Sequence, residues 1–253
     1  MAYFNGPVNP TLIPLYDMTW AGNSNPRRCR DFLAPADQNF PPPNVDIDRN
    51  DLPRAAQMAE RMGLSDEFQH IFTLTKRGAP HNGNIIFLRH LIESRDTLVE
   101  LNTPVVLFST LSNDIAQFTT FSPNLCLDLV NDLFELIEGL PNLKLAFIQC
   151  ITPRSEHLSC PVEIFWKNAE KVNLLIAVRA SACEKVVCLK LRGLKYENRG
   201  GQKVMADINR VTLDGIHPRP NLYIQRLRME VLENCKVLRG GSKKKHKRGP
   251  RRR

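Results

Sequence analysis

Pro104-Val105-Val106-Leu107-Phe108 runs directly into Ser109-Thr110-Leu111-Ser112-Asn113-Asp114. The four residues after the proline are all apolar, which is typical of a strand buried on both faces, and the largely polar run after them indicates a turn at the end of that strand. Residues 143–150 repeat the arrangement, since a mainly apolar run leads into Ile151-Thr152-Pro153-Arg154. Strands without a polar face are found in parallel sheets that helices cover on both sides.

The rest of the chain alternates between strand and helix signals around these two stretches. Strand character recurs at residues 12–20, 68–74 and 186–191. Helical periodicity covers residues 52–62, 84–101, 124–140, 163–180 and 221–238. The alternation predicts an α/β fold, with a mostly parallel sheet between two layers of helices, in which ligands bind beyond the carboxyl ends of the strands.

Length and composition are those of a globular protein. The 253 residues, 42% hydrophobic and 24% charged, suffice for one large domain, which we place at residues 1–238 with a proline-rich loop or insertion at 34–50. No apolar run reaches the roughly 18–20 residues that a membrane span requires, and the N-terminal segment lacks the pattern of a secretory signal. We therefore expect an intracellular protein, cytoplasmic or nuclear.

The net charge of +9 comes entirely from residues 239–253. This tail holds nine Lys and Arg and no acid, and subtracting nine from the total of 35 leaves 26, equal to the 26 Asp and Glu. We expect the tail to be disordered, and to bind RNA or DNA, to be read by an import receptor, or to act only as a solubilising terminus. The residues expected to contact a nucleic-acid backbone are Lys243, Lys244, Lys245, Lys247, Arg248, Arg251, Arg252 and Arg253.

The seven cysteines form no Cys-x-x-Cys pair and are odd in number. This pattern argues against a disulfide framework and against a zinc site, so no metal is expected. Several of them, Cys150 and Cys188 included, lie in apolar runs. Buried free thiols in a reducing compartment fit this placement best.

Polar residues at successive predicted strand ends form an ordered set. Ser24 follows the first strand, Gly78 the second and Asn113 the third, while Asp214 and His217 precede the last helix. The set predicts nucleophilic catalysis, in which Ser24 attacks, His217 takes its proton and Asp214 orients His217. The amides of Ser24 and Gly78 and the carboxamide of Asn113 are the expected oxyanion hole.

The order Ser, Gly, Asn and Asp-x-x-His resembles the four sequence blocks of the SGNH, or GDSL-type, hydrolases. The resemblance is strongest in the C-terminal two-thirds, at residues 105–114, 148–154 and 213–218 and in the helix that carries Asn168 and Asn173. It implies a flavodoxin-like three-layer α/β/α sandwich that hydrolyses carboxylic esters, often acetyl or acyl groups on lipids or glycans. It also implies that no metal or organic cofactor is needed.

Three features depart from the family pattern. Asn23 stands where the first block usually has Asp, and Leu111 stands where the third block usually has Gly, which could crowd the oxyanion pocket. A rival alignment takes residues 45–51 as the first strand and turn, which puts Asp51 at the nucleophile position and makes the domain inactive.

Two functions follow from these alternatives. The first is a serine esterase of the SGNH type that forms an acyl-enzyme. The second is a catalytically inactive SGNH-like scaffold that binds nucleic acid through its basic tail.

Overall fold

The computed structural model describes residues 16–22, 29, 33, 52–75, 95, 98–99 and 102–235. The expected loop at 34–50, most of the helix expected at 84–101 and the basic tail at 239–253 lie outside the described residues. Within the described part of the chain, no helix has both the length and the apolar character to cross a membrane.

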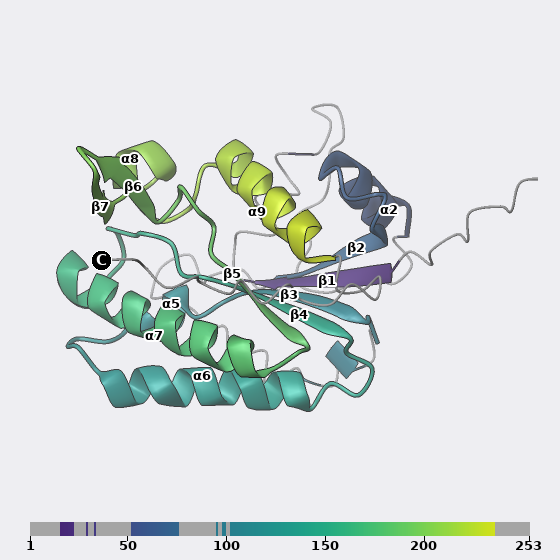
Figure 1. Ribbon diagram of the computed structural model, residues 1–253, viewed down its shortest axis with the longest axis horizontal. Helices are drawn as coiled ribbons and strands as arrows, with labels where there is room; N and C mark the ends of the chain where they lie inside the picture. Colours follow the sequence, from purple (N-terminus) through teal and green to yellow (C-terminus); the bar gives the residue numbers. More distant parts are fainter. Residues whose placement is uncertain are drawn as a thin grey trace, which may run out of the picture.

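A five-stranded parallel sheet forms the centre of the molecule, in the order β2-β1-β3-β4-β5 (Figure 1). Its strands are β1 (Tyr16–Gly22), β2 (Phe68–Thr75), β3 (Val105–Ser109), β4 (Leu145–Gln149) and β5 (Val186–Leu189). This is the flavodoxin-like order. The prediction of an α/β fold with a parallel sheet is confirmed.

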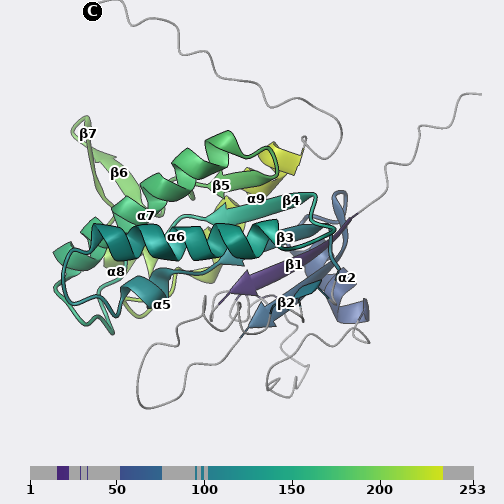
Figure 2. The same ribbon diagram turned by 90° about the horizontal axis from the view of Figure 1, so that it is seen from below.

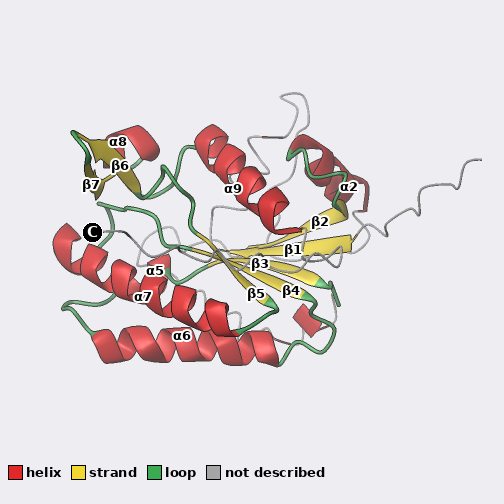
Figure 3. Ribbon diagram, in the orientation of Figure 1, coloured by secondary structure: helices red, strands yellow, loops and turns green. Residues whose placement is uncertain are grey.

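Helices cover both faces of this sheet, so the molecule has three layers (Figures 1 and 3). One face carries α6 (Pro123–Glu138) and α7 (Val162–Ala182), and the other carries α2 (Leu52–Arg61) and α9 (Pro220–Cys235). Seen from below, α6 and α7 lie in front of the sheet and α9 lies behind it (Figure 2). Two short helices, α5 (Ser112–Ile115) and α8 (Ile208–Val211), lie in the connections.

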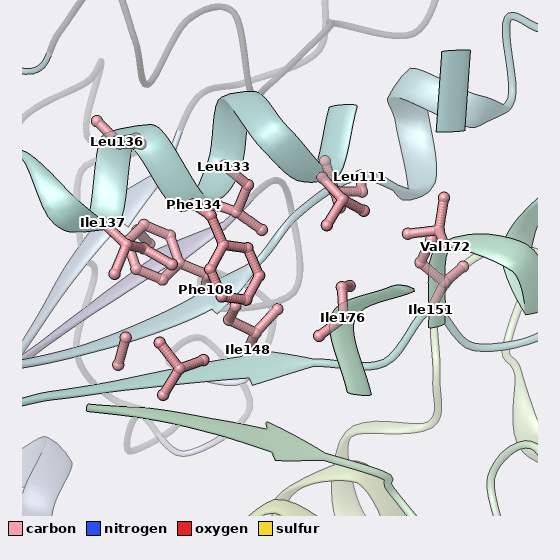
Figure 4. Close-up of a cluster of buried hydrophobic side chains, with 14 of the residues drawn as sticks. Phe108, Leu111, Leu133, Phe134, Leu136, Ile137, Ile148, Ile151, Val172 and Ile176 are labelled. Carbon is pink, nitrogen blue, oxygen red and sulfur yellow. The ribbon is translucent and has the colours of Figure 1, made fainter. Parts of the chain in front are cut away.

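The sheet separates two hydrophobic cores, which explains why its central strands have no polar face. Along β3, Val106 and Phe108 belong to the core under α6 and α7, and Val105 and Leu107 belong to the core under α2 and α9. Figure 4 shows Phe108 in the first core, with side chains of α6 packed over it. Burial of one such side chain contributes roughly 1.5–3 kcal/mol. Because alternate residues of β3 point to opposite faces, they stabilise the packing of helices on both sides of the sheet.

The strand order changes direction between β1 and β3. From β1 the chain moves to β2 on one side, and it then returns to place β3 on the other side of β1. In sheets of this kind, ligands bind beyond the carboxyl ends of the strands at such a switch point. The register places Gly22, the last residue of β1, beside Thr75 of β2 and Ser109 of β3, so these three strands end together.

One pair of strands was absent from the sequence prediction. A two-stranded antiparallel sheet pairs β6 (Tyr196–Arg199) with β7 (Gln202–Met205) outside the main sheet. Both strands are short and mixed in polarity, so they have little periodicity. Their turn is Gly200-Gly201 with φ of 56° and 83°, and two glycines between short runs are a known hairpin signal.

Candidate active site

Asp214 and His217 form a hydrogen-bonded pair on the loop before α9. One carboxylate oxygen of Asp214 accepts the backbone N–H groups of Ile216 and His217, at 3.1 and 2.8 Å. The other oxygen lies 2.8 Å from Nδ1 of the His217 ring. The two carboxylate oxygens therefore have different roles, since one fixes the turn and the other faces the imidazole.

The ionisation of Asp214 determines which ring nitrogen of His217 can act as a base. Burial alone would raise the pKa of Asp214, but hydrogen bonds from the His217 amide and imidazole outweigh it and lower the pKa to about 2. An ionised carboxylate only accepts hydrogen bonds, so Nδ1 must carry the proton. In the neutral imidazole, Nε2 then keeps the lone pair that a general base requires.

The turn that carries this pair is hydrogen bonded to the loop after β4. The carbonyl of Gly215 accepts the N–H of Ser155 at 2.7 Å. Gly215 has φ of +72°, and a Cβ there would come within 2.6 Å of the Ser155 hydroxyl and 2.5 Å of Glu156 Cγ. Glycine is thus required both by the backbone angle and by the close approach of the two loops.

Asn113 lies in α5, just beyond the end of β3. Its side-chain oxygen accepts a hydrogen bond from the Arg154 guanidinium at 2.8 Å. This contact fixes the orientation of the carboxamide. Among the described residues, none accepts a hydrogen bond from its NH₂ group, so the Asn113 NH₂ is available as a donor to a bound molecule.

Arg154 links Asn113 to the loop that holds the Asp214 turn. The residue is 2% exposed, and its guanidinium also donates to the carbonyls of Glu156 and His157 at 2.7 and 2.9 Å. Burial lowers the pKa of Arg154 to about 10, and the negative charge of Asp214 opposes that shift. Sequence reasoning identified Arg154 only as part of a Pro-Arg turn; the position of that turn directly after a buried strand was the available signal.

Leu111 has the backbone conformation that the usual glycine of the third block would adopt easily. Its φ is 72°, in the left-handed region that costs a residue with a Cβ about 1–2 kcal/mol. The side chain is 1% exposed and lies in the core formed with α6 (Figure 4). The departure from the family pattern is thus accommodated by the core, where burial of the leucine offsets the backbone strain.

Two buried asparagines of α7 fix the loops that follow β3 and β4. Asn168 accepts the N–H of Ser122 at 2.9 Å and donates to the carbonyl of Thr120 at 2.9 Å. Asn173 makes the equivalent pair of hydrogen bonds to the backbone N–H and carbonyl of Ile151, at 2.7 and 3.2 Å. Because each carboxamide satisfies one donor and one acceptor, these asparagines hold irregular backbone at the edge of the sheet.

The remaining predicted site residues lie outside the described residues. These are Ser24, Gly78, the rival Asp51 and the basic residues of the tail. The strands that precede Ser24 and Gly78 are β1 and β2, which end side by side at the same edge as β3. Among the described residues, no group of three or more His, Cys, Asp or Glu side chains is arranged to hold a metal ion.

Several solved structures that resemble this fold are described as hydrolases. A proposed acylhydrolase from Bacteroides fragilis matches at 12% identity with a TM-score of 0.57, over 90% of this chain and 92% of its own. A GDSL-like lipase from Bacteroides thetaiotaomicron matches at 13% identity with a TM-score of 0.56, over 88% and 89%. A catalytic mutant of Axe2, an acetylxylan esterase from Geobacillus stearothermophilus, matches at 12% identity with a TM-score of 0.52, over 89% and 96%.

These likenesses were found by comparison of structures, at sequence identities of 12–13%. No family model matches the chain, and no curated protein matches its sequence. The neighbours nevertheless cover most of the chain, and the strand order is the one that the sequence resemblance implied. The chain therefore has the fold of the SGNH, or GDSL-type, hydrolases.

Proposed function

We propose that this protein is a serine esterase that hydrolyses a carboxylic ester through an acyl-enzyme. The observation that carries the proposal is the contact between Asp214 and Nδ1 of His217, which leaves Nε2 as the basic nitrogen. This pair is fastened to the loop that follows β4, near the carboxyl ends of the strands. A hydroxyl presented to Nε2 at that edge would complete a catalytic triad.

Ser24 is the hydroxyl that we assign as the nucleophile. It comes two residues after β1, one of the two strands at the switch point, and Asn113 follows the other. Two solved variants of the acetylxylan esterase Axe2 that are described as catalytic mutants replace an aspartate and a serine. The replacement of the usual Asp by Asn23 leaves the attacking group itself in place.

The rival assignment of Asp51 has less support from the sheet. It takes residues 45–51 as the first strand and turn, whereas the strand between β2 and β3 is β1, which precedes Ser24. Asp51 directly precedes α2. A helix after the residue therefore does not discriminate against Asp51, but ligands bind at the carboxyl ends of strands at the switch point, and the position of β1 next to β3 favours Ser24.

In the proposed reaction, Ser24 Oγ attacks the ester carbonyl while His217 Nε2 takes the hydroxyl proton. Asp214 stabilises the imidazolium that forms. The Asn113 NH₂, with the backbone amides of Ser24 and Gly78, donates hydrogen bonds to the oxyanion. His217 then passes the proton to the leaving alcohol, and a water molecule activated by the same nitrogen releases the acid. An acetyl or other acyl ester of a small molecule, glycan or lipid suits this sequence of steps.

The experiment is hydrolysis of a short-chain aryl ester by the full chain and by Ser24→Ala, His217→Ala and Ser181→Ala. Ser181 is exposed on α7 and is the matched control for loss of a hydroxyl. We expect activity to be lost in the first two variants and kept in the third. Activity that survives in Ser24→Ala but not in His217→Ala would assign the nucleophile elsewhere, and absence of hydrolysis by the unaltered chain would reject the esterase.

A second function is favoured by the charge of the tail. Nine Lys and Arg in residues 239–253, set against a neutral remainder, suit the phosphate backbone of RNA or DNA on an SGNH-like scaffold. Binding should then weaken steeply with salt, by about 0.9 log units of affinity per log unit of salt for each phosphate neutralised. Removal of residues 239–253 should abolish most of the affinity, and unchanged binding by the truncated chain would reject this function.

A further inference from the structure

Two cysteines from neighbouring strands lie against each other at one edge of the main sheet. Cys188 belongs to β5, and Cys150 is the residue directly after β4. The register pairs Ile148 with Cys188, so Cys150, two residues on from Ile148, projects from the same face. Their sulfur atoms are 3.4 Å apart, and both thiols are free. A disulfide would require the sulfurs to approach to about 2.05 Å.

Both cysteines line a cavity of about 600 Å³ between α7 and the segment that leads into β6. None of its lining residues belongs to the Asp214–His217 turn. Three cations, Lys190, Arg192 and Lys195, also line it.

The acids of this cavity are already engaged. Glu197 pairs with Arg199 and Arg210, at 2.6 Å in each case. Glu170 accepts the hydroxyl hydrogen of Tyr196. Among the described residues, no acid forms an ion pair with Lys190, Arg192 or Lys195. Glu170 keeps its negative charge, but the three cations outnumber it, so the net charge left for a ligand is positive and an anionic molecule suits the cavity.

The environment of the pair favours a state in which Cys150 is a thiolate and accepts a hydrogen bond from the Cys188 thiol. The hydrogen bond from Cys188 lowers the pKa of Cys150 against the opposing effects of burial and of the negative charge of Glu230, and the charge of Lys195 adds to the decrease. As the donor, Cys188 has its own pKa raised. By contrast, burial raises the pKa of Cys126, which has no such partner thiol, to about 11. Thiolates are the nucleophilic form of cysteine.

We propose that Cys150 and Cys188 are a thiol–disulfide exchange site that takes an anionic low-molecular-weight disulfide, the class of glutathione disulfide, through this cavity. The Cys150 thiolate attacks one sulfur of the incoming disulfide, whose S–S bond breaks as one glutathione thiolate leaves. Cys188 loses its proton and attacks the Cys150 sulfur, and the second glutathione thiolate leaves. Two protein cysteines are oxidised to one disulfide, and one glutathione disulfide is reduced to two glutathione molecules. One of these takes the Cys188 proton, and the other takes from solvent the proton that Cys150 had released on ionisation.

The first test maps the oxidised cysteines of the full chain after incubation with glutathione disulfide. We expect the intact mass to fall by two hydrogen atoms and proteolytic peptides to contain a Cys150–Cys188 link. Cys188→Ser should instead trap one glutathione on Cys150. Cys183→Ser removes a half-buried cysteine at the end of α7 and should leave the result unchanged. Glutathione attached first to Cys160 or Cys183 of the unaltered chain would overturn the proposal without recourse to any variant.

The second test separates recognition of charge from simple thiol reactivity. We compare the rates of oxidation by glutathione disulfide, which is anionic, hydroxyethyl disulfide, which is neutral, and cystamine, which is cationic. The anionic reagent should be fastest, and Lys195→Gln should slow it about fivefold relative to the neutral reagent. Equal rates for the three reagents, or a Lys195→Gln variant that keeps the anionic preference, would reject the assignment of the cavity as the entry site.

Discussion

Two Asp–His pairs in this protein have nearly the same local geometry and different surroundings. Asp17 lies 2.8 Å from Nδ1 of His70, as Asp214 does from Nδ1 of His217. The side chains are also similarly exposed, at 40% and 14% in the first pair and 38% and 16% in the second. Distance and exposure therefore do not distinguish a candidate catalytic pair from an ordinary contact.

The surroundings make the difference. Asp17 and His70 face each other across β1 and β2, near the amino ends of those strands. The Asp214–His217 pair occupies a turn with two backbone amides on the carboxylate, and that turn is hydrogen bonded to the loop of Arg154, whose guanidinium contacts Asn113. Parallel sheets of this type bind ligands at the carboxyl ends of the strands, where the second pair lies. Position in the fold is thus the reason that we propose the second pair, and not the first, as catalytic.

The largest expected effect is that of His217→Ala, with His70→Ala as its counterpart. Loss of the general base should lower kcat/KM on an aryl ester by at least about 1,000-fold, because the proposed mechanism relies on Nε2 of His217 to take the serine proton. His70→Ala should retain activity within about twofold. Steady-state kinetics of both variants measures this difference. An equal loss of kcat/KM in the two variants would contradict a specific role of His217 as the general base.

The next effect is that of Asp214→Asn, compared with Asp17→Asn. The amide removes the negative charge that fixes the proton on Nδ1 and stabilises the imidazolium, so we expect kcat to fall by about 100-fold or more. Asp17→Asn should change the stability by no more than about 1 kcal/mol and leave kcat unaltered. If Asp214→Asn kept full activity, the carboxylate would have only a structural role in its turn.

Arg154→Met tests whether the buried guanidinium positions the site. We expect kcat to fall about tenfold while KM stays nearly constant, because the Asn113 carboxamide loses the contact that orients it. The stability should change by less than about 2 kcal/mol, since loss of the hydrogen bonds is offset by removal of a desolvated charge. Lysine cannot donate at once to the Asn113 carboxamide and to the carbonyls of Glu156 and His157, so Arg154→Lys should show a similar fall in kcat. Full kcat in both variants would contradict a positioning role.

The smallest effect is a dependence of stability on pH that belongs to Asp214. Its pKa in the folded protein is about 2, below the ordinary value of 3.8, so ionisation stabilises the fold. That stabilisation is complete above the ordinary value and is lost as the pH falls toward 2. The difference in free energy of unfolding between the unaltered chain and Asp214→Asn should therefore shrink between about pH 4 and pH 2, as measured by denaturant titration. A difference that is constant over this window would contradict the stabilisation of ionised Asp214 by His217 and Ile216.

Much of the fold could be read from periodicity along the chain. The strands predicted at 68–74, 104–108, 143–150 and 186–191 are present with ends that differ by a few residues. Their apolar character on both faces required two layers of helices, which the structure has. The hairpin of β6 and β7 was not predicted, because strands of four residues are too short to show a clear hydrophobic alternation. The pair Gly200-Gly201 was the available signal for its turn.

The candidate site could be predicted only in part from the sequence. The Asp214–His217 contact spans three residues, so the spacing in the sequence suffices to propose it. Arg154 and Asn113 lie 41 residues apart and meet only because β3 and β4 are neighbours. Cys150 and Cys188 likewise meet through the register of β4 and β5, which no local pattern encodes.

By itself, the sequence determined which segments are buried strands, which are covering helices and which short turn brings an acid to a histidine. Hydrophobic periodicity and short-range spacing are local properties, and they can be counted along the chain. Only the tertiary structure decided which strand ends lie side by side, that Arg154 joins two loops and that two thiols share a cavity. Those contacts depend on strand order and register, which are set by the packing of the whole sheet between its two cores.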